Sequence, residues 1–189
     1  MCRSHRDAEE RTRKVGLEAM KKLLLATRNK GKIQEFHRIL EEIAPGEIEL
    51  VGLDQFPDLA DVEETGTTFE ENALLKARQM SAATGLPAIA DDSGLCVDAL
   101  GGDPGIFSAR WSGVHGDDEA NLQKVLDQIK DVPDADRTAY FICVAALALV
   151  DGSSHCEEGR FHGQLLHHPV GDNGFGYDPI FSPDGYSIS

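Results

Sequence analysis

The sequence predicts an α/β protein in which a mixed, twisted sheet with flanking helices forms an elongated, two-lobed single domain. In the first half of the chain, short apolar segments alternate with segments whose apolar residues have helical spacing. In the second half, the longest apolar stretch, residues 137–150, is followed by the hairpin signal Asp151-Gly152 and a returning segment at 154–163. The alternating half favours parallel strands and the hairpin adds antiparallel ones, so the sheet should be mixed.

Length and composition bound the class of protein. The 189 residues suffice for one domain with a substantial core. The net charge of −15 argues against nonspecific binding to nucleic acid or anionic membranes. It still allows a nucleotide substrate, provided that a divalent cation mediates. No apolar run approaches the length of a membrane span. From the charge and the absence of such a run, we expect neither a nucleic-acid partner nor a membrane.

The cysteines and histidines suggest no metal centre. The four cysteines, at positions 2, 96, 143 and 156, include no Cys-x-x-Cys pair, which predicts neither a zinc site nor a disulfide framework and favours a cytoplasmic location. His162, His167 and His168 match no metal-binding spacing. Residues 1–19 carry mixed charge and few large apolar groups, so we expect a poorly ordered extension before a folded domain at 20–189.

The first strand and helix meet at a polar loop. Residues 21–26 predict a strand, and residues 33–43 have helical spacing. The junction between them offers free backbone N–H groups and the positive end of a helix dipole to an anion. The candidate ligands are Thr27, Arg28, Asn29, Lys30, Gly31 and Lys32. Because the Walker pattern is absent, an ordinary helix cap with solvated lysines remains an alternative.

The next segment combines acidic and basic candidates. Residues 47–51 predict a second strand, and an acidic loop containing Glu63 and Glu64 follows. Thr67 or Thr68 is the expected N-cap of a helix that carries Lys76 on its polar side. A solvated acidic loop and a surface lysine are the alternative interpretation of these residues.

The segment Ala88–Gly94 is the strongest candidate for a functional centre. Its three small or apolar residues indicate the end of a buried strand, and ligands in open α/β sheets bind just beyond such strand ends. Asp91 and Asp92 should point to opposite sides, so that one faces a ligand while the protein holds the other. Because Asp-Asp-Ser-Gly is also typical of turns, the segment alone leaves a simple turn equally open.

The second half adds a cation and a flexible aromatic loop. Arg110 lies among small and aromatic residues and is a candidate partner for an aspartate or a phosphate. A helix is predicted at 117–129. The glycines at 174–178 allow close approach to a flat ligand, on which an aromatic ring could stack. An anion-binding junction, carboxylates for Mg²⁺ and a stacking ring together describe a nucleotide phosphohydrolase.

Long, ordered motifs then point to a family. They are Thr27-x-Asn29-x-x-Lys32; Glu63-Glu64-Thr65-Gly66-x-Thr68-Phe69-x-Glu71-Asn72-Ala73-x-x-Lys76-Ala77; Ala90-Asp91-Asp92-Ser93-Gly94-Leu95; Gly101-Gly102-x-Pro104-Gly105-Ile106-x-Ser108-Ala109-Arg110; and Gly174-Phe175-Gly176-Tyr177-Asp178-Pro179. Over about residues 21–183 the chain resembles the inosine triphosphate pyrophosphatase (XTP/dITP diphosphatase) family. The resemblance implies a Mg²⁺-dependent homodimer. It would cleave noncanonical purine triphosphates such as ITP, dITP and XTP into the monophosphate and pyrophosphate, and so clean the nucleotide pool.

The resemblance also implies roles for individual residues. Asp92 matches the general base and a metal ligand, and Glu63 matches the second metal ligand, with Glu64 as the alternative. The remaining matches contact substrate: the loop Thr27–Lys32 binds the triphosphate, Lys76 and Ser93 contact the nucleotide, and Phe175, Gly176, Tyr177 and Asp178 bind the base.

The sequence departs from the family pattern after the aromatic loop. The family continues into a Thr-x-Ala-Glu-Leu-like segment, a lysine and a Ser-His-Arg motif that reads the 6-keto group, whereas this sequence ends at Ser189. We therefore expect the C-terminal segment to be missing, with weak base discrimination and slow turnover. Two alternatives stay open. One is a purine-nucleotide-binding remnant with little turnover, and the other is a Maf-like nucleotide pyrophosphatase.

Overall fold

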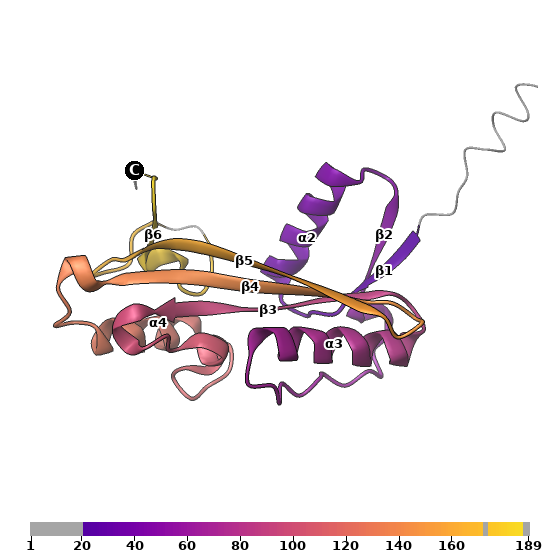
Figure 1. Ribbon diagram of the computed structural model, residues 1–189, viewed down its shortest axis with the longest axis horizontal. Helices are drawn as coiled ribbons and strands as arrows, with labels where there is room; N and C mark the ends of the chain where they lie inside the picture. Colours follow the sequence, from indigo (N-terminus) through magenta and orange to yellow (C-terminus); the bar gives the residue numbers. More distant parts are fainter. Residues whose placement is uncertain (1–20, 172–173, 187–189) are drawn as a thin grey trace, which may run out of the picture.

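A mixed sheet of six strands organises the molecule (Figure 1). The structure is a computed structural model that describes residues 21–171 and 174–186. The strands, in the spatial order β2-β1-β3-β4-β5-β6, are β1 (Lys21–Leu25), β2 (Ile48–Gly52), β3 (Ala88–Val97), β4 (Thr138–Ala148), β5 (Ser154–Leu165) and β6 (Phe181–Pro183). Strand β1 pairs in parallel with β2 and β3, and the other pairs are antiparallel. The predicted mixed sheet is confirmed, while the expected extension at 1–19 lies outside the described residues.

Helices cover both faces of the sheet. In Figure 1, α2 (Lys30–Ile43) lies above β3 and β4, and α3 (Phe69–Thr84) and α4 (Asp118–Gln128) lie below them. Short 3₁₀ turns connect these elements: η1 (Leu53–Gln55), η2 (Asp98–Leu100), η3 (Gly105–Arg110), η4 (Asp134–Asp136) and η5 (Asp178–Ile180). Among the described residues, no helix has the length and apolarity that crossing a bilayer requires.

The start of α3 shows why the helix begins where the sequence indicates. The Thr68 hydroxyl accepts the backbone N–H of Glu71 at 3.1 Å, and the Glu71 carboxylate accepts the N–H of Thr67 at 2.7 Å. This reciprocal pair satisfies the N–H of Glu71, which the first turn leaves free, and the N–H of Thr67 just before the helix. Thr68, one of the two expected residues, is therefore the N-cap, and the acidic loop is held just ahead of the helix.

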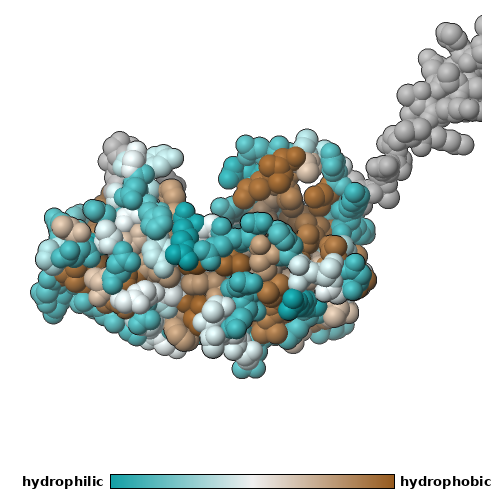
Figure 2. All heavy atoms as spheres, viewed as in Figure 1, coloured by the Kyte–Doolittle hydropathy of each residue, from teal (hydrophilic) through white to brown (hydrophobic). Residues whose placement is uncertain are grey.

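The apolar stripe of α2 is only partly covered by the described residues. No α2 side chain is fully buried, and Ile39 and Ile43 are 36% and 71% exposed. Figure 2 shows hydrophobic side chains gathered over α2 and the strands beside it. The first turn of α2, which carries Lys32, is the part of the helix that engages the sheet through a buried ion pair.

Strand β3 belongs to two hydrophobic cores. Ala88 and Ala90 join the first core, with α3 and strands β1 and β2, whereas Leu95 and Val97 join the second, with α4 and β6. The polar segment 91–94 separates the two. The prediction that the strand ends before Asp91 is wrong, because β4 pairs with β3 along its whole length, from Ala88 to Val97. The alternative of a simple Asp-Asp-Ser-Gly turn is excluded by the same pairing.

Gly94 serves close packing in this continuous strand. A Cβ atom at this position would collide with the carbonyl oxygen of Gly105 and the hydroxyl oxygen of Ser108. The Ser108 hydroxyl accepts the backbone N–H of Leu95 at 2.9 Å and donates to the Gly105 carbonyl at 2.7 Å. The glycine thus lets η3 lie directly on β3, which fixes Arg110 at the end of η3 near the aspartates.

Candidate active site

The candidate site is a cavity of about 570 Å³ beside the middle of β3. Strand β1 pairs with β3 only at Leu24 and Leu25, so β3 runs on past the end of its parallel neighbour. The aspartates therefore lie beyond the carboxyl end of β1, although not beyond that of their own strand. Predicted residues at the wall are Thr27, Arg28, Asn29, Lys32, Glu63, Glu64, Lys76, Asp91, Asp92 and Ser93. Lys30, Gly31 and the loop 174–178 do not line it.

The loop before α2 is an N-cap with one buried cation. The Asn29 side chain accepts the backbone N–H groups of Gly31 at 2.9 Å and Lys32 at 3.2 Å. Asn29 therefore caps the helix, and it also lines the cavity, so its role as a ligand stays a prediction. The alternative of a solvated lysine is wrong for Lys32, whose side chain is 20% exposed and whose ammonium contacts Asp91. Arg28 lies at the outer edge, where it contacts Asp61 at 2.7 Å.

Asp91 and Asp92 are held on opposite faces of β3, as the alternation of a strand predicts. On the α2 face, one oxygen of Asp91 accepts from the Lys32 ammonium at 2.5 Å, and the other is buried without a partner among the described residues. A buried oxygen of this kind is rare, because losing water without a replacement costs free energy.

On the α3 face, two residues hold the Asp92 carboxylate. The Asn72 amide donates to it at 3.1 Å and the Lys76 ammonium at 3.2 Å. Burial raises the pKa of Asp92, the charge of Lys76 opposes that rise, and the charge of Glu64 adds to it. Burial also works against the charged form of Lys76, but Asp92 and Glu64 prevail and raise the pKa of Lys76. The pKa values of Asp92 and Lys76 both rise, because Lys76 is shared between two carboxylates and Asp92 has only one cation among the described residues.

Glu64 and Glu63 differ in how they are engaged. One oxygen of Glu64 accepts from Lys76 at 2.9 Å and the other from Arg110 at 3.0 Å. Burial opposes ionisation of Glu64, yet these two cations lower its pKa overall. The Glu63 side chain has no hydrogen bond within the described residues. The described chain also holds no group of three or more His, Cys, Asp or Glu side chains placed to bind a metal.

The aromatic loop lies against the start of α2. A Cβ atom on Gly31 would lie 3.2 Å from two ring atoms of Phe175, a residue that is 48% exposed. The Phe175 N–H donates to Asp178 at 3.0 Å, and the Gly176 N–H donates to Asp118 at 3.2 Å. The exposed ring available for stacking is therefore that of Phe175.

Tyr177, by contrast, belongs to the second core. The residue is 6% exposed, and its hydroxyl donates to the Ser108 carbonyl at 2.9 Å. Its ring anchors the loop to η3 and is not exposed for stacking.

Several site residues were not found from the sequence. Asn72 was noted only for its helical spacing, and Asp118 only as part of a helix start. Arg110 was a candidate partner for an aspartate or a phosphate, but its contact with Glu64 was not foreseen. His115 and Asp61 line the cavity without belonging to any motif that we identified. The contacts that reveal these residues join distant parts of the chain, so no local pattern indicates them.

Comparisons with known proteins show which family the chain resembles. Residues 23–189 match the model of the Ham1 family. The dITP/XTP pyrophosphatases of Streptomyces avermitilis and Streptomyces coelicolor are 60% and 58% identical over 166 residues, which cover 88% of this chain and 82% of each relative.

Solved structures show the same fold. The nucleoside-triphosphatase / dITP/XTP pyrophosphatase of Mycobacterium abscessus is 50% identical and superposes with a TM-score of 0.73, covering 87% of this chain and 85% of that one. A HAM1 protein from Coxiella burnetii is 42% identical, with a TM-score of 0.76 over 86% of this chain and 81% of that one.

Proposed function

The chain belongs to the Ham1 family, and on this premise we propose that it hydrolyses noncanonical purine nucleoside triphosphates such as dITP, XTP and ITP to the monophosphate and pyrophosphate. The observation that carries this function is the buried Asp92, which faces a cavity lined by the cations Lys32, Lys76 and Arg110. Curated relatives named dITP/XTP pyrophosphatases supply the substrate class. Removal of these nucleotides protects the nucleotide pool.

Asp92 is the general base of this proposal. Its raised pKa makes it a better proton acceptor than an ordinary aspartate, and Asn72 and Lys76 fix the direction of its oxygens. Lys32 and Lys76 offset the charge that develops on the departing pyrophosphate. Each group thus acts where the reaction generates a proton or a negative charge.

The donor set fits Mg²⁺. Mg²⁺ takes oxygen ligands, often one or two carboxylates together with substrate phosphates. Asp92 and Glu63 are the proposed ligands. Glu63 is preferred to Glu64 because its side chain has no hydrogen bond among the described residues, whereas two cations, Lys76 and Arg110, already bind Glu64. Magnesium, when bound, would neutralise phosphate charge and polarise the phosphoryl group.

The remaining assignments follow from the resemblance and the loop geometry. Ser93 contacts the nucleotide, and the loop Thr27–Lys32 binds the triphosphate through the four of its residues that line the cavity, Thr27, Arg28, Asn29 and Lys32. Phe175 stacks on the purine, and its loop is held by the backbone N–H groups of Phe175 and Gly176, which donate to the carboxylates of Asp178 and Asp118. A homodimer in the cytoplasm is the proposed form of the enzyme, and the net charge of −15 gives no reason to propose a nucleic-acid partner.

The test is a pyrophosphate-release assay on dITP, XTP, ITP, ATP, dUTP and dTTP, with Mg²⁺ and with EDTA. We expect turnover of the first three substrates that requires Mg²⁺. A preference for dUTP or dTTP would instead favour a Maf-like pyrophosphatase. Full activity in EDTA would contradict the Mg²⁺ assignment alone and leave the substrate assignment standing.

A further inference from the structure

The cavity contains a cation that the proposed mechanism does not require. We propose that Arg110 is a polyphosphate-binding residue and that Glu64 holds it until a polyphosphate takes its place. This inference rests on the proposed function for the location of the site. It concerns how the site recognises the pyrophosphate half of its substrate.

The guanidinium of Arg110 is only partly engaged. Its side chain is 31% exposed, and Nη1 donates to Glu64 at 3.0 Å. Within the described residues Nε and Nη2 make no hydrogen bond, and the group lies 5.3 Å from the centre of the Phe107 ring. A guanidinium has five N–H donors arranged as a fork that suits phosphate oxygens. Arg110 therefore keeps most of its donors free at the wall of the cavity.

The backbone that carries Arg110 is fixed. Two residues earlier, the Ser108 hydroxyl is tied to Leu95 and Gly105, and the Ser108 carbonyl accepts the Tyr177 hydroxyl. Gly94 allows this close contact with β3. Binding a phosphate would thus order only the Arg110 side chain, which keeps the entropic cost of recognition small.

The order of the ion pairs places Arg110 relative to the reaction. Lys76 links Asp92 to Glu64, and Glu64 links Lys76 to Arg110. Arg110 is therefore two ion pairs farther from the general base than Lys76 is. If the α-phosphorus lies beside Asp92, Arg110 is placed for the β- and γ-phosphates.

Glu64 is suited to hold Arg110 reversibly. It offers one negative charge, and it also contacts Lys76. A pyrophosphate group carries more charge and can accept both arms of the guanidinium. When Arg110 moves to a phosphate, Glu64 keeps Lys76 as a partner, so no carboxylate is left buried and unpaired.

The alternative is that Arg110 and Glu64 form a static surface ion pair, which contributes little to stability or binding.

A double-mutant cycle distinguishes a phosphate-binding Arg110 from a static ion pair. The measurement is titration with inorganic pyrophosphate by calorimetry in EDTA. We expect R110Q to bind pyrophosphate about tenfold more weakly, because it loses a charged hydrogen bond. E64Q should bind several-fold more tightly, because the competitor of the phosphate is gone. The double variant should lose most of that gain.

Two variants serve as controls. R160Q removes the same charge from the Arg160–Glu158 pair, which does not line the cavity, and should bind as the unmodified chain does. R110K keeps the charge but not the fork and should fall between R110Q and the unmodified chain. Thermal unfolding of every variant checks that the fold is intact.

Two results would overturn the proposal: R110Q binding that equals that of the unmodified chain, or a gain in E64Q that persists in full when Arg110 is also replaced. Because neither Mg²⁺ nor a nucleoside is present, the cycle can succeed even if purine triphosphates are not hydrolysed. It can also fail in an enzyme that hydrolyses them well.

Discussion

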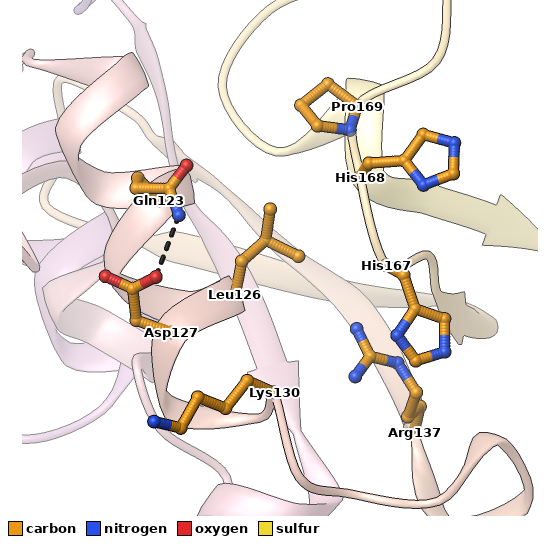
Figure 3. Close-up of a pocket in the computed structure, with 8 residues that line it drawn as sticks. All are labelled: Gln123, Leu126, Asp127, Lys130, Arg137, His167, His168 and Pro169. Carbon is orange, nitrogen blue, oxygen red and sulfur yellow. Dashed lines mark hydrogen bonds between the residues drawn. The ribbon is translucent and has the colours of Figure 1, made fainter.

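Two hollows on the described part of the molecule are lined by cations, but different partners hold those cations. The cavity beside β3 holds Lys32, Lys76 and Arg110 through carboxylate side chains. A second hollow of about 260 Å³ lies between α4 and the segment after β5 (Figure 3). Its residues are Gln123, Leu126, Asp127, Lys130, Arg137, His167, His168 and Pro169.

Arg137 in the second hollow is tied to the backbone. It is 2% exposed, and its guanidinium donates to the carbonyls of Leu165 at 2.9 Å, Ile129 at 2.7 Å and Leu166 at 2.6 Å. These carbonyls belong to the ends of α4 and β5, which Arg137 joins at the start of β4. A backbone carbonyl cannot turn away without moving its element, whereas a carboxylate side chain can change partners. Arg137 is therefore a structural clamp between α4 and β5, whereas a substrate can recruit Lys32, Lys76 and Arg110.

The largest effect is expected at the catalytic carboxylate. D92N keeps the shape of the side chain but cannot accept a proton, so kcat/KM for dITP should fall by about 10²–10⁴-fold, with any lost metal contact adding to that. Because the fold raises the pKa of Asp92, it disfavours the charged form, and the midpoint of thermal unfolding should not decrease. Activity within a few-fold of the unmodified chain would remove Asp92 from the role of general base.

The structural clamp should show the opposite behaviour. R137A leaves three carbonyls without their donor, and we expect a loss of about 3 kcal/mol in unfolding free energy, or roughly 6–12 °C in Tm. The activity of the folded fraction, measured at low temperature, should be unchanged. A variant with normal Tm and reduced activity would contradict the distinction between the two hollows.

For Lys32, the structure changes the effect that the sequence alone predicts for a substitution. The sequence alone predicts that K32A affects triphosphate binding more than folding. The structure adds that K32A leaves the buried Asp91 carboxylate unpaired, which also destabilises the fold. We expect KM for dITP to rise about 10–100-fold, from the loss of a charged hydrogen bond, together with a lower Tm.

A second substitution separates these two effects. In K32A/D91N the buried charge is gone, so the Tm should recover while the KM stays high. Recovery of both would show that Lys32 acts only through the fold. Recovery of neither would show that Asp91 itself contributes to the site.

Local signals account for most of the fold that the sequence predicts. Hydrophobic periodicity and caps act over a few residues, and they place α3 after Thr68 and β4 within 137–150. The predicted end of β3 before Asp91 was wrong for a physical reason. Its continuation past Asp91 depends on pairing with β4, whose residues lie about fifty positions later in the chain.

The site follows the same rule. Residue types and motifs identify Asp92, Lys32 and Lys76 as candidates. Their partners depend on tertiary structure: Lys32 and Asp91 are 59 residues apart, and Arg110 and Glu64 are 46 apart. The alternative of a turn at Asp-Asp-Ser-Gly stayed open for the same reason, because a glycine in a turn and a glycine in a close-packed strand are alike in sequence.

The smallest effect is expected at the rim of the second hollow. Asp134 contacts His167 at 2.7 Å, but the two side chains are 87% and 55% exposed. The hydrogen bond from His167, followed by its charge, lowers the pKa of Asp134. A lowered carboxyl pKa gives stability that is present above the ordinary pKa of the group and lost as pH falls through the lowered value.

D134N should therefore change the Tm by at most about 2 °C at pH 7 and low salt, because an exposed pair is well solvated. The difference from the unmodified chain should shrink as the pH falls below the ordinary range of an aspartate, and also as salt is added. Thermal unfolding across pH, with R137A as the reference for a large loss, measures both trends. A loss of Tm as large as that of R137A would mean that the exposed Asp134–His167 pair, and not the buried guanidinium of Arg137, joins α4 to β5. Arg137 would then no longer be the structural cation that distinguishes the second hollow from the cavity beside β3.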